Sequence, residues 1–169
     1  MVFAVSLALL AFVPMIAEAA LSRAHERALR ALGAREPAGD VYALMQVAYP
    51  GCFLAIILEG WWRGSGFATV PVAGVALFVA AKALKYWAIA TLGQRWTFRV
   101  LVPPGAPRSR RGPYRFLRHP NYVAVVGELA GFATIAGAPV AGAGSVLIFG
   151  ALMLMRVRVE EAALGRNAA

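Results

Sequence analysis

Five long apolar segments, separated by shorter polar connections, divide the chain. They cover residues 2–20, 41–59, 67–92, 121–138 and 140–159. A helix that crosses the ~30 Å hydrocarbon core of a bilayer needs about 20 apolar residues, and each segment has nearly that length or more. None alternates apolar and polar residues as a membrane β-strand does. The pattern predicts an all-α, polytopic membrane helix bundle with about five transmembrane helices, forming a single domain over residues 1–169.

Only Pro139 separates the fourth apolar segment from the fifth. Proline has no backbone N–H to donate, and its ring clashes with the preceding turn of a helix, so a helix rarely continues through it. The last two helices are therefore expected to form a tight antiparallel hairpin that turns at this proline.

The composition agrees with a membrane protein, because 60% of the residues are hydrophobic and only 15% are charged. The net charge of +9 does not indicate a nucleic-acid partner, since the cations lie between apolar segments, around residues 23–35, 95–118 and 156–166. Positively charged loops stay in the cytoplasm, which places the N-terminus outside and the C-terminus inside. Lys82 and Lys85 are expected to reach back to the cytoplasmic interface, with their ammonium groups in water. Membrane lipids are the expected partners.

The first apolar segment also resembles a secretory signal, because Ala17-Glu18-Ala19 has the small-residue spacing of a cleavage site. No Lys or Arg precedes this segment and four Arg residues follow it, which is the reverse of a signal peptide, so a membrane helix is favoured. His25 lacks the spacing to other ligand-type residues that a metal requires, and no metal site is predicted.

Polar residues gather where the fourth apolar segment begins, in the sequence GPYRFLRHPNY from Gly112 to Tyr122. Pro120 suits the first turn of a helix, which puts His119 near the N-cap. The N-terminus of a helix carries partial positive charge and free N–H groups, so it suits a carboxylate or another anion. Arg115 and Arg118 strengthen that field.

A second polar group, RVRVEE from Arg156 to Glu161, follows the last apolar segment. Glu160 and Glu161 are expected at or beyond the cytoplasmic end of that helix, where the helix dipole disfavours negative charge. Either Arg156 and Arg158 pair with these carboxylates within the helix, or the carboxylates hold a cationic ligand such as an ammonium or a sulfonium. Both polar groups fall on the cytoplasmic side and are expected to form one site.

Together these stretches resemble the GxYxxxRHPxY and RxxxEExxL motifs of the isoprenylcysteine carboxyl methyltransferase family, over roughly residues 92–165. That family consists of integral-membrane enzymes that use S-adenosylmethionine without a Rossmann domain, and no GxGxxG follows a strand here. The resemblance implies a methyltransferase in a bacterial inner membrane with S-adenosylmethionine as cofactor. It assigns the cofactor site to Tyr114, Arg118, His119, Pro120, Tyr122, Glu160 and Glu161.

The resemblance also implies a lipophilic methyl acceptor that meets the cofactor at the boundary between membrane and cytosol. Eukaryotic relatives carry a histidine upstream of GxY, where this chain has VLVPPGAP at 100–107. Residues 92–100 look more like bacterial relatives, some of which are associated with O-methylation of long-chain aromatic or pyrone lipids. The acceptor is therefore expected to be either an isoprenylcysteine-type carboxylate or a long-chain phenolic or pyrone lipid.

Glu128 lies inside the fourth apolar segment, where a carboxylate costs ~2.5–3.5 kcal/mol, so it is expected to face the bundle interior. One interpretation makes it catalytic with Arg118 and His119, facing the substrate or accepting a proton; the other makes it a structural carboxyl paired with lysine. Gly127 and Gly131 form a GxxxG motif that predicts close helix packing. Three other functions stay open: a phospholipid N-methyltransferase, an NADPH-dependent lipid reductase of similar helix arrangement, and a non-enzymatic membrane scaffold.

Overall fold

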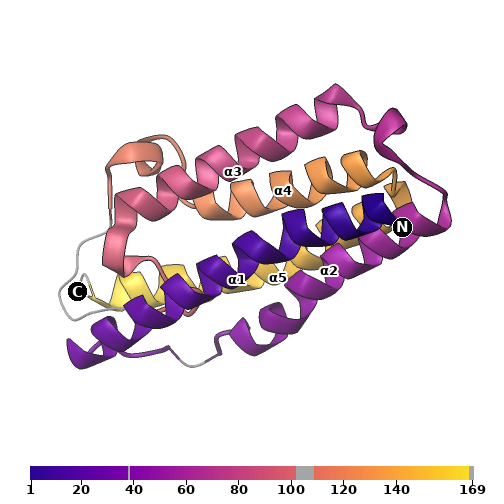
Figure 1. Cartoon of the computed structure of the whole chain (residues 1–169). Coiled ribbons are helices and arrows are strands. Elements are labelled where there is room, and N and C mark those ends of the chain that lie inside the picture. The colour runs from indigo at the N-terminus through magenta and orange to yellow at the C-terminus, as the bar shows by residue number, and fades with distance from the viewer. Residues whose placement is uncertain (38, 102–108, 168–169) are drawn as a thin grey trace.

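The structure, a computed structural model, describes residues 1–37, 39–101 and 109–167, with the side chains of those before residue 163. Five long helices lie side by side along one axis (Figure 1). They are α1 (Val2–Ala31), α2 (Tyr42–Trp62), α3 (Val72–Leu92), α4 (Pro120–Ala136) and α5 (Pro139–Asn167). Short 3-10 turns, η1 (Phe67–Thr69), η2 (Gly93–Arg95) and η3 (Gly112–Arg115), lie between them. The described residues contain no strand, which confirms the predicted all-α fold.

Four of the helices, α1, α2, α3 and α5, are long and apolar enough to cross a membrane. The fifth, α4, has only 17 residues, and ten of them are buried. It packs against α2, α3 and α5 and is the central helix of the bundle. The chain therefore has the architecture of an integral-membrane protein, with its shortest helix at the centre.

Glycines bring α3 and α4 into close contact. A Cβ atom added at Gly131 would lie 2.6 Å from the backbone nitrogen of Phe78, and one added at Gly127 would lie 3.0 Å from the Cβ of Ala81. Because α4 has no side chain at these two positions, its backbone can approach α3 closely. This confirms that the GxxxG motif serves helix packing.

The hairpin between α4 and α5 forms as predicted, but its turn precedes the proline. Gly137 ends α4 in the left-handed conformation (φ 64°, ψ 35°), which glycine adopts without strain, and Pro139 is the first residue of α5. Both oxygens of the Glu59 carboxylate then accept backbone N–H groups in the first turn of α5, from Val140 at 3.3 Å and Ala141 at 2.5 Å. A carboxylate at a helix N-terminus stabilises that end of the helix.

Two helices are longer than the apolar pattern predicts. Helix α1 continues to Ala31, so Arg23, Arg27 and Arg30 lie on a helix and not in a loop. Helix α5 continues to Asn167, so Glu160 and Glu161 lie within it, and their expected position at its C-terminal end is wrong. Membrane thickness limits only the apolar part of a helix; Ala, Leu, Arg and Glu are good helix formers and extend it into water.

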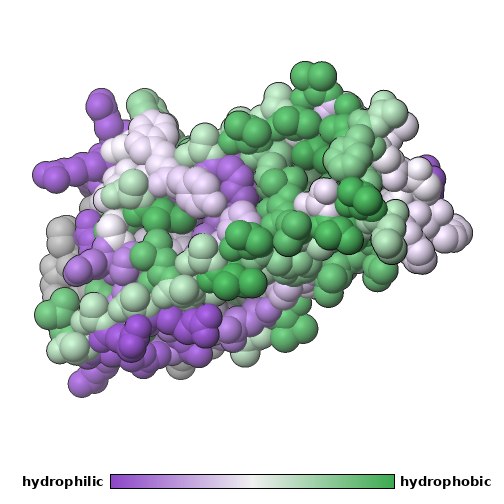
Figure 2. All heavy atoms as spheres, viewed as in Figure 1, coloured by the Kyte–Doolittle hydropathy of each residue, from purple (hydrophilic) through white to green (hydrophobic). Residues whose placement is uncertain are grey.

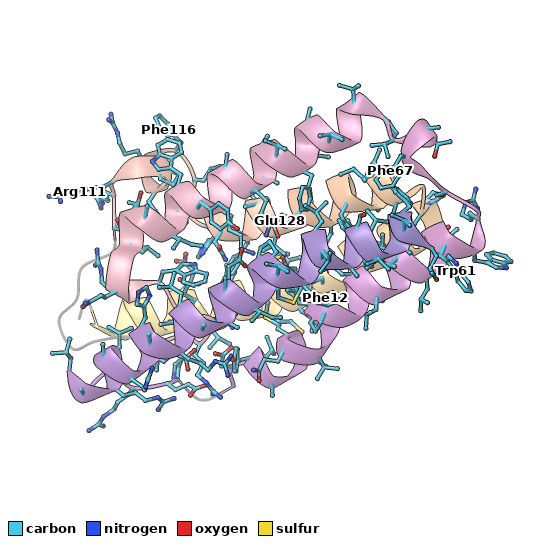
Figure 3. The ribbon with its side chains drawn as sticks, viewed as in Figure 1. Phe12, Trp61, Phe67, Arg111, Phe116 and Glu128 are labelled. Atoms are coloured by element: carbon cyan, nitrogen blue, oxygen red, sulfur yellow. The ribbon has the colours of Figure 1, made fainter. Side chains whose placement is uncertain are left out.

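Polar and apolar residues occupy different parts of the surface. In Figure 2 apolar residues cover the middle of the visible face and extend toward the right, where the tip is paler, whereas hydrophilic residues gather at the left end and along the lower left edge. Arg111 and Phe116 lie at that left end, while Trp61 and Phe67 lie at the opposite one (Figure 3). The left end also holds η2, η3 and the C-terminal part of α5 (Figure 1). Both predicted motifs therefore lie at the same end of the bundle.

Candidate functional site

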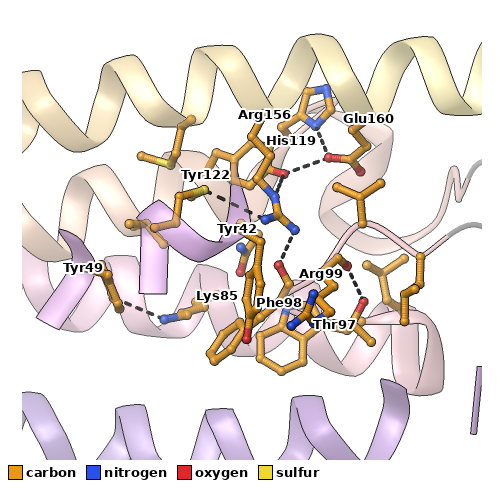
Figure 4. Close-up of a pocket in the computed structure, with 18 of the residues that line it drawn as sticks. Tyr42, Tyr49, Lys85, Thr97, Phe98, Arg99, His119, Tyr122, Arg156 and Glu160 are labelled. Atoms are coloured by element: carbon orange, nitrogen blue, oxygen red, sulfur yellow. Dashed lines mark hydrogen bonds and ion pairs between the residues drawn. The ribbon is translucent and has the colours of Figure 1, made fainter. Parts of the chain in front are cut away.

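A cavity of about 430 Å³ opens at this end of the bundle. Its walls come from all five helices and from the connection between α3 and α4, including residues 95–101. The connection thus contributes to the cavity, and its proline-rich part, 102–108, lies outside the described residues. Polar side chains surround the outer part of the cavity, and Tyr49 and Lys85 lie at its inner end (Figure 4).

The imidazole of His119 joins the two sequence motifs. His119 is the N-cap of α4, and its ring reaches across to α5, where Nε2 lies 2.8 Å from Glu161 Oε1 and Nδ1 lies 3.6 Å from Glu160 Oε2. The ring also stacks on Tyr122, with centroids 5.4 Å apart and planes inclined by 12°. The structure therefore brings the histidine and the paired carboxylates together in one place.

Arg156 is the residue that connects the most parts of the site. It is almost fully buried and donates to the Tyr122 hydroxyl (3.0 Å), to Asp40 Oδ1 (3.3 Å) and to the carbonyl oxygen of Phe98. Because Tyr122 accepts from Arg156, its own proton points to Glu160 Oε2, which lies 2.8 Å away. Arg156 thus binds the start of α2, the loop and α4, and the expected pairing of Arg156 with Glu160 within the helix is not the arrangement observed.

Hydrogen bonds to α1 hold the loop that follows α3, which lines the cavity. The Ser22 hydroxyl accepts the N–H of Phe98 at 2.8 Å, and His25 Nδ1 lies 2.8 Å from the Trp96 carbonyl. Arg99 binds Glu36 at 2.8 Å and lies over the ring of Tyr42.

Sequence reasoning missed two residues that shape the site, Asp40 and Phe98. Asp40 accepts both the Arg156 guanidinium and, at 3.1 Å, the N–H of Val100. The only signal available for Asp40 was an isolated acid directly before an apolar helix, which is also the ordinary signature of a helix start.

Most of the predicted cofactor residues face the cavity. Tyr114, Arg118, His119, Tyr122 and Glu160 line it, whereas Pro120 is buried as the first residue of α4, and Glu161 lies behind His119 as its partner.

The Tyr114 phenol stays protonated and is suited to donate a hydrogen bond. Burial raises the pKa of this phenol, and the negative charge of Glu160 raises it further, although Arg95 opposes the change.

Glu128 does not line the cavity; it lies in the middle of the bundle (Figure 3). Its Oε2 atom lies 3.4 Å from Lys82 Nζ and 3.3 Å from Lys85 Nζ, and it accepts the Tyr49 hydroxyl at 2.5 Å. Glu18 completes the group, 3.1 Å from Lys82 and 2.6 Å from Lys85. We call Glu18, Tyr49, Lys82, Lys85 and Glu128 the buried charge cluster.

This cluster corrects the prediction for the two lysines. The ammonium of Lys85 is not in water, because the residue is only 1% exposed, and Lys82 also turns toward the two glutamates. Each lysine ammonium is paired with buried carboxylates, so it does not need water at the interface to stabilise its charge. The lysine-paired interpretation of Glu128 therefore describes its contacts, while a catalytic role for it stays a prediction.

The residues at the cavity fit S-adenosylmethionine, which carries an ammonium, a sulfonium, a carboxylate and an aromatic base. Glu160 suits the cationic groups, and Arg118 suits the carboxylate. Asn121 Oδ1 is buried and has no hydrogen-bond partner among the described residues, so it can accept an N–H from a ligand. The volume lies within the range of ~300–1,000 Å³ typical of small-molecule sites. Across the described part of the chain, no group of three or more His, Cys, Asp or Glu side chains is placed to hold a metal ion.

Comparisons with known proteins agree with the two motifs. The sequence model of the Isoprenylcysteine carboxyl methyltransferase (ICMT) family matches residues 74–166. The uncharacterized protein YpbQ of Bacillus subtilis is 30% identical over 157 residues, which are 88% of this chain and 88% of that protein. An uncharacterized protein of Haemophilus influenzae is 26% identical over 145 residues, 85% of this chain and 84% of the relative. No solved structure matches this chain. By the family match and the similarity to YpbQ, the chain belongs to the isoprenylcysteine carboxyl methyltransferase family.

Proposed function

We propose that this protein is an S-adenosylmethionine-dependent O-methyltransferase that acts on a lipophilic acceptor at the boundary between membrane and cytosol. The observation that carries the proposal is the contact between the two motifs, with His119 Nε2 2.8 Å from Glu161 Oε1 beside a cavity that continues into the bundle. Family membership supports methyl transfer. The four apolar helices support a membrane location.

The outer part of the cavity is the proposed cofactor site. Glu160, held by the Tyr122 hydroxyl, presents a carboxylate to the cationic groups of the ligand, and Arg118 answers its carboxylate. The neutral phenol of Tyr114 donates a hydrogen bond from η3. When bound, S-adenosylmethionine supplies an electrophilic methyl group; the protein supplies position and a site with little water.

The acceptor is proposed to come from the bilayer. Each buried CH₂ group of a lipid chain stabilises the membrane-bound state by ~0.8 kcal/mol, so a prenyl or long-chain substrate remains in the membrane while the charged cofactor remains in water. A site between helices that opens at a polar end allows the two to meet. An isoprenylcysteine-type carboxylate and a long-chain phenol or pyrone are the two acceptor classes considered.

Arg118 and His119 are proposed to act next to the reacting groups, since both line the cavity at the N-terminus of α4. Glu161 would hold the imidazole in one orientation through the 2.8 Å contact. Glu128 would accept a proton from a hydroxyl acceptor by way of Tyr49, whose hydroxyl lies between the cavity and this carboxylate. We further propose that the N-terminus lies outside a bacterial inner membrane and the C-terminus in the cytoplasm.

The experiment that tests the function is incubation of the purified protein with methyl-labelled S-adenosylmethionine and a panel of lipophilic acids, phenols and phosphatidylethanolamine. Label in a phenol or an acid supports the proposal, whereas label only in the phospholipid amine identifies an N-methyltransferase. Titration with S-adenosylhomocysteine and NADPH separates a reductase, which binds only the nucleotide. A protein that binds neither, and methylates nothing, is a scaffold.

A further inference from the structure

The buried charge cluster forms part of the inner end of the cavity. Lys85 and Tyr49 are its two members that line the cavity, and Lys85 Nζ lies 3.4 Å from the Tyr49 hydroxyl (Figure 4). The neighbouring wall is apolar, with Pro50, Val125 and Phe149. The inner end therefore offers a small hydrogen-bonding edge among hydrophobic side chains, which suits the polar head of an amphiphilic molecule.

The charges within the cluster already balance. Lys82 and Lys85 contribute two positive charges, and Glu18 and Glu128 contribute two negative charges, which sum to zero. Each lysine ammonium lies within 3.4 Å of both glutamates. Glu18 is 4% exposed and Glu128 is fully buried, so water does not screen these charges. A carboxylate brought to Lys85 would add a negative charge that no cation of the cluster is left to balance, and burying such a charge is costly.

An uncharged hydroxyl meets no such obstacle. Its oxygen can accept a hydrogen bond from the Lys85 ammonium, and its proton can be donated to the Tyr49 oxygen, because the Tyr49 proton is already donated to Glu128 Oε2. Glu128 Oε1 is a buried acceptor with no hydrogen-bond partner in the described part of the chain, but Glu128 does not line the cavity. An uncharged hydroxyl therefore finds a donor and an acceptor at the inner end and leaves the net charge of the cluster at zero.

We propose that the inner end of the cavity binds the uncharged, hydroxyl-bearing head of the acceptor, an alcohol, phenol or enol, and discriminates against a carboxylate. The inference rests on the proposed function and decides between its two acceptor classes. Lys85 and Tyr49 contact the head, Glu18 and Glu128 set the charge of the site, and the apolar wall takes the adjoining ring or chain.

The test compares two ligands that differ only in the head, 4-octylphenol and 4-octylbenzoic acid, binding to the detergent-purified protein without cofactor. At pH 7 the phenol is neutral and the acid is ionised, since their pKa values lie near 10 and 4. Tryptophan fluorescence or the thermal midpoint reports binding. We expect the phenol to bind about tenfold tighter or more. Equal or tighter binding of the acid overturns the inference.

Variants then change the charge of the site. Glu128→Gln leaves the cluster at +1, and we expect the octylbenzoate affinity to rise about tenfold while the phenol affinity changes less. Glu18→Gln also leaves the cluster at +1, and Glu18 does not line the cavity. This second variant replaces the first in the test if Glu128→Gln does not fold. A structural role alone predicts no gain of carboxylate binding, so an unchanged ratio of the two affinities contradicts the assignment.

A matched pair of tyrosine variants locates the contact. Tyr49→Phe removes the hydroxyl at the inner end and is expected to weaken phenol binding about tenfold relative to the acid. Tyr42→Phe, on the same helix and also lining the cavity, is expected to leave the ratio of affinities unchanged. These binding assays contain no cofactor, so their outcome does not depend on the cofactor site. In a separate titration, failure to bind S-adenosylhomocysteine would contradict the proposed function and leave the head-group preference undecided.

Discussion

The guanidinium of Arg156 donates from Nε to the Tyr122 hydroxyl at 3.0 Å, and this single contact orients the site. With its oxygen occupied by Arg156, the hydroxyl donates to Glu160 Oε2. The arginine of one motif therefore acts on the glutamate of the same motif through a tyrosine of the other. The resemblance of the two motifs assigned Tyr122 and Glu160 to the predicted cofactor site, and the order of donors and acceptors gives each of them a separate position in it.

Arg156→Lys should weaken cofactor binding although the charge is kept. An ammonium cannot reproduce a planar guanidinium that contacts Tyr122, Asp40 and Phe98 together. Loss of hydrogen bonds to a charged group predicts a dissociation constant for S-adenosylhomocysteine about ten- to a hundredfold higher by calorimetry. Arg158→Lys, an exposed position two residues away, is the control and should bind as the parent does.

Tyr122→Phe and Glu160→Ala should not have additive effects. Each substitution removes the same 2.8 Å contact, so the double variant should lose about as much cofactor affinity as the worse single variant. The measurement is a double-mutant cycle on S-adenosylhomocysteine binding. Fully additive losses would mean that the two side chains act independently, and the relay from Arg156 to Glu160 would be refuted.

His119→Ala should abolish most methyl transfer and leave the fold intact. The imidazole makes contacts with Glu160 and Glu161 at the mouth of the cavity but does not belong to the buried core. We expect turnover to fall at least about a hundredfold, the usual scale for a positioned catalytic group, with a thermal midpoint near that of the parent. Cofactor binding and turnover as in the parent would favour a non-enzymatic scaffold.

Glu128→Gln should reduce turnover of hydroxyl acceptors with little loss of cofactor affinity. The carboxylate accepts the Tyr49 hydroxyl deep in the bundle, whereas the proposed cofactor residues lie at its polar end. Steady-state turnover and S-adenosylhomocysteine binding, measured on one preparation, separate the two effects. Unchanged turnover removes Glu128 from the mechanism.

Gly131→Ala should destabilise the bundle. The added Cβ would lie 2.6 Å from the backbone nitrogen of Phe78, so α3 and α4 would have to move apart, at a cost of about 1–3 kcal/mol. Gly144→Ala in α5 is the matched control, because nothing lies within 4 Å of its added Cβ and alanine favours a helix more than glycine does. The thermal midpoint in detergent should fall for the first variant and stay equal or rise for the second.

The amino-acid sequence alone determined where the helices lie and which end of the bundle carries the chemistry. Each apolar run is a local property, because membrane thickness and hydrogen-bond satisfaction within one segment decide it. The two motifs are also local features of the sequence. One precedes the fourth apolar run and the other follows the fifth, so a hairpin of these two helices brings both motifs to the same end of the bundle. The glycine pair at 127 and 131 was local in the same way and correctly predicted a packing face.

Tertiary structure decided which partner each charged residue takes. Arg156 has Glu160 one turn away along α5, yet it binds Tyr122 and Asp40, which are 34 and 116 residues distant. Lys85 could extend along its own helix to water, yet it binds Glu18 from α1. These choices depend on the rotation and register of one helix against another, which arise from the packing of all five, and a pattern read along a single helix does not contain them.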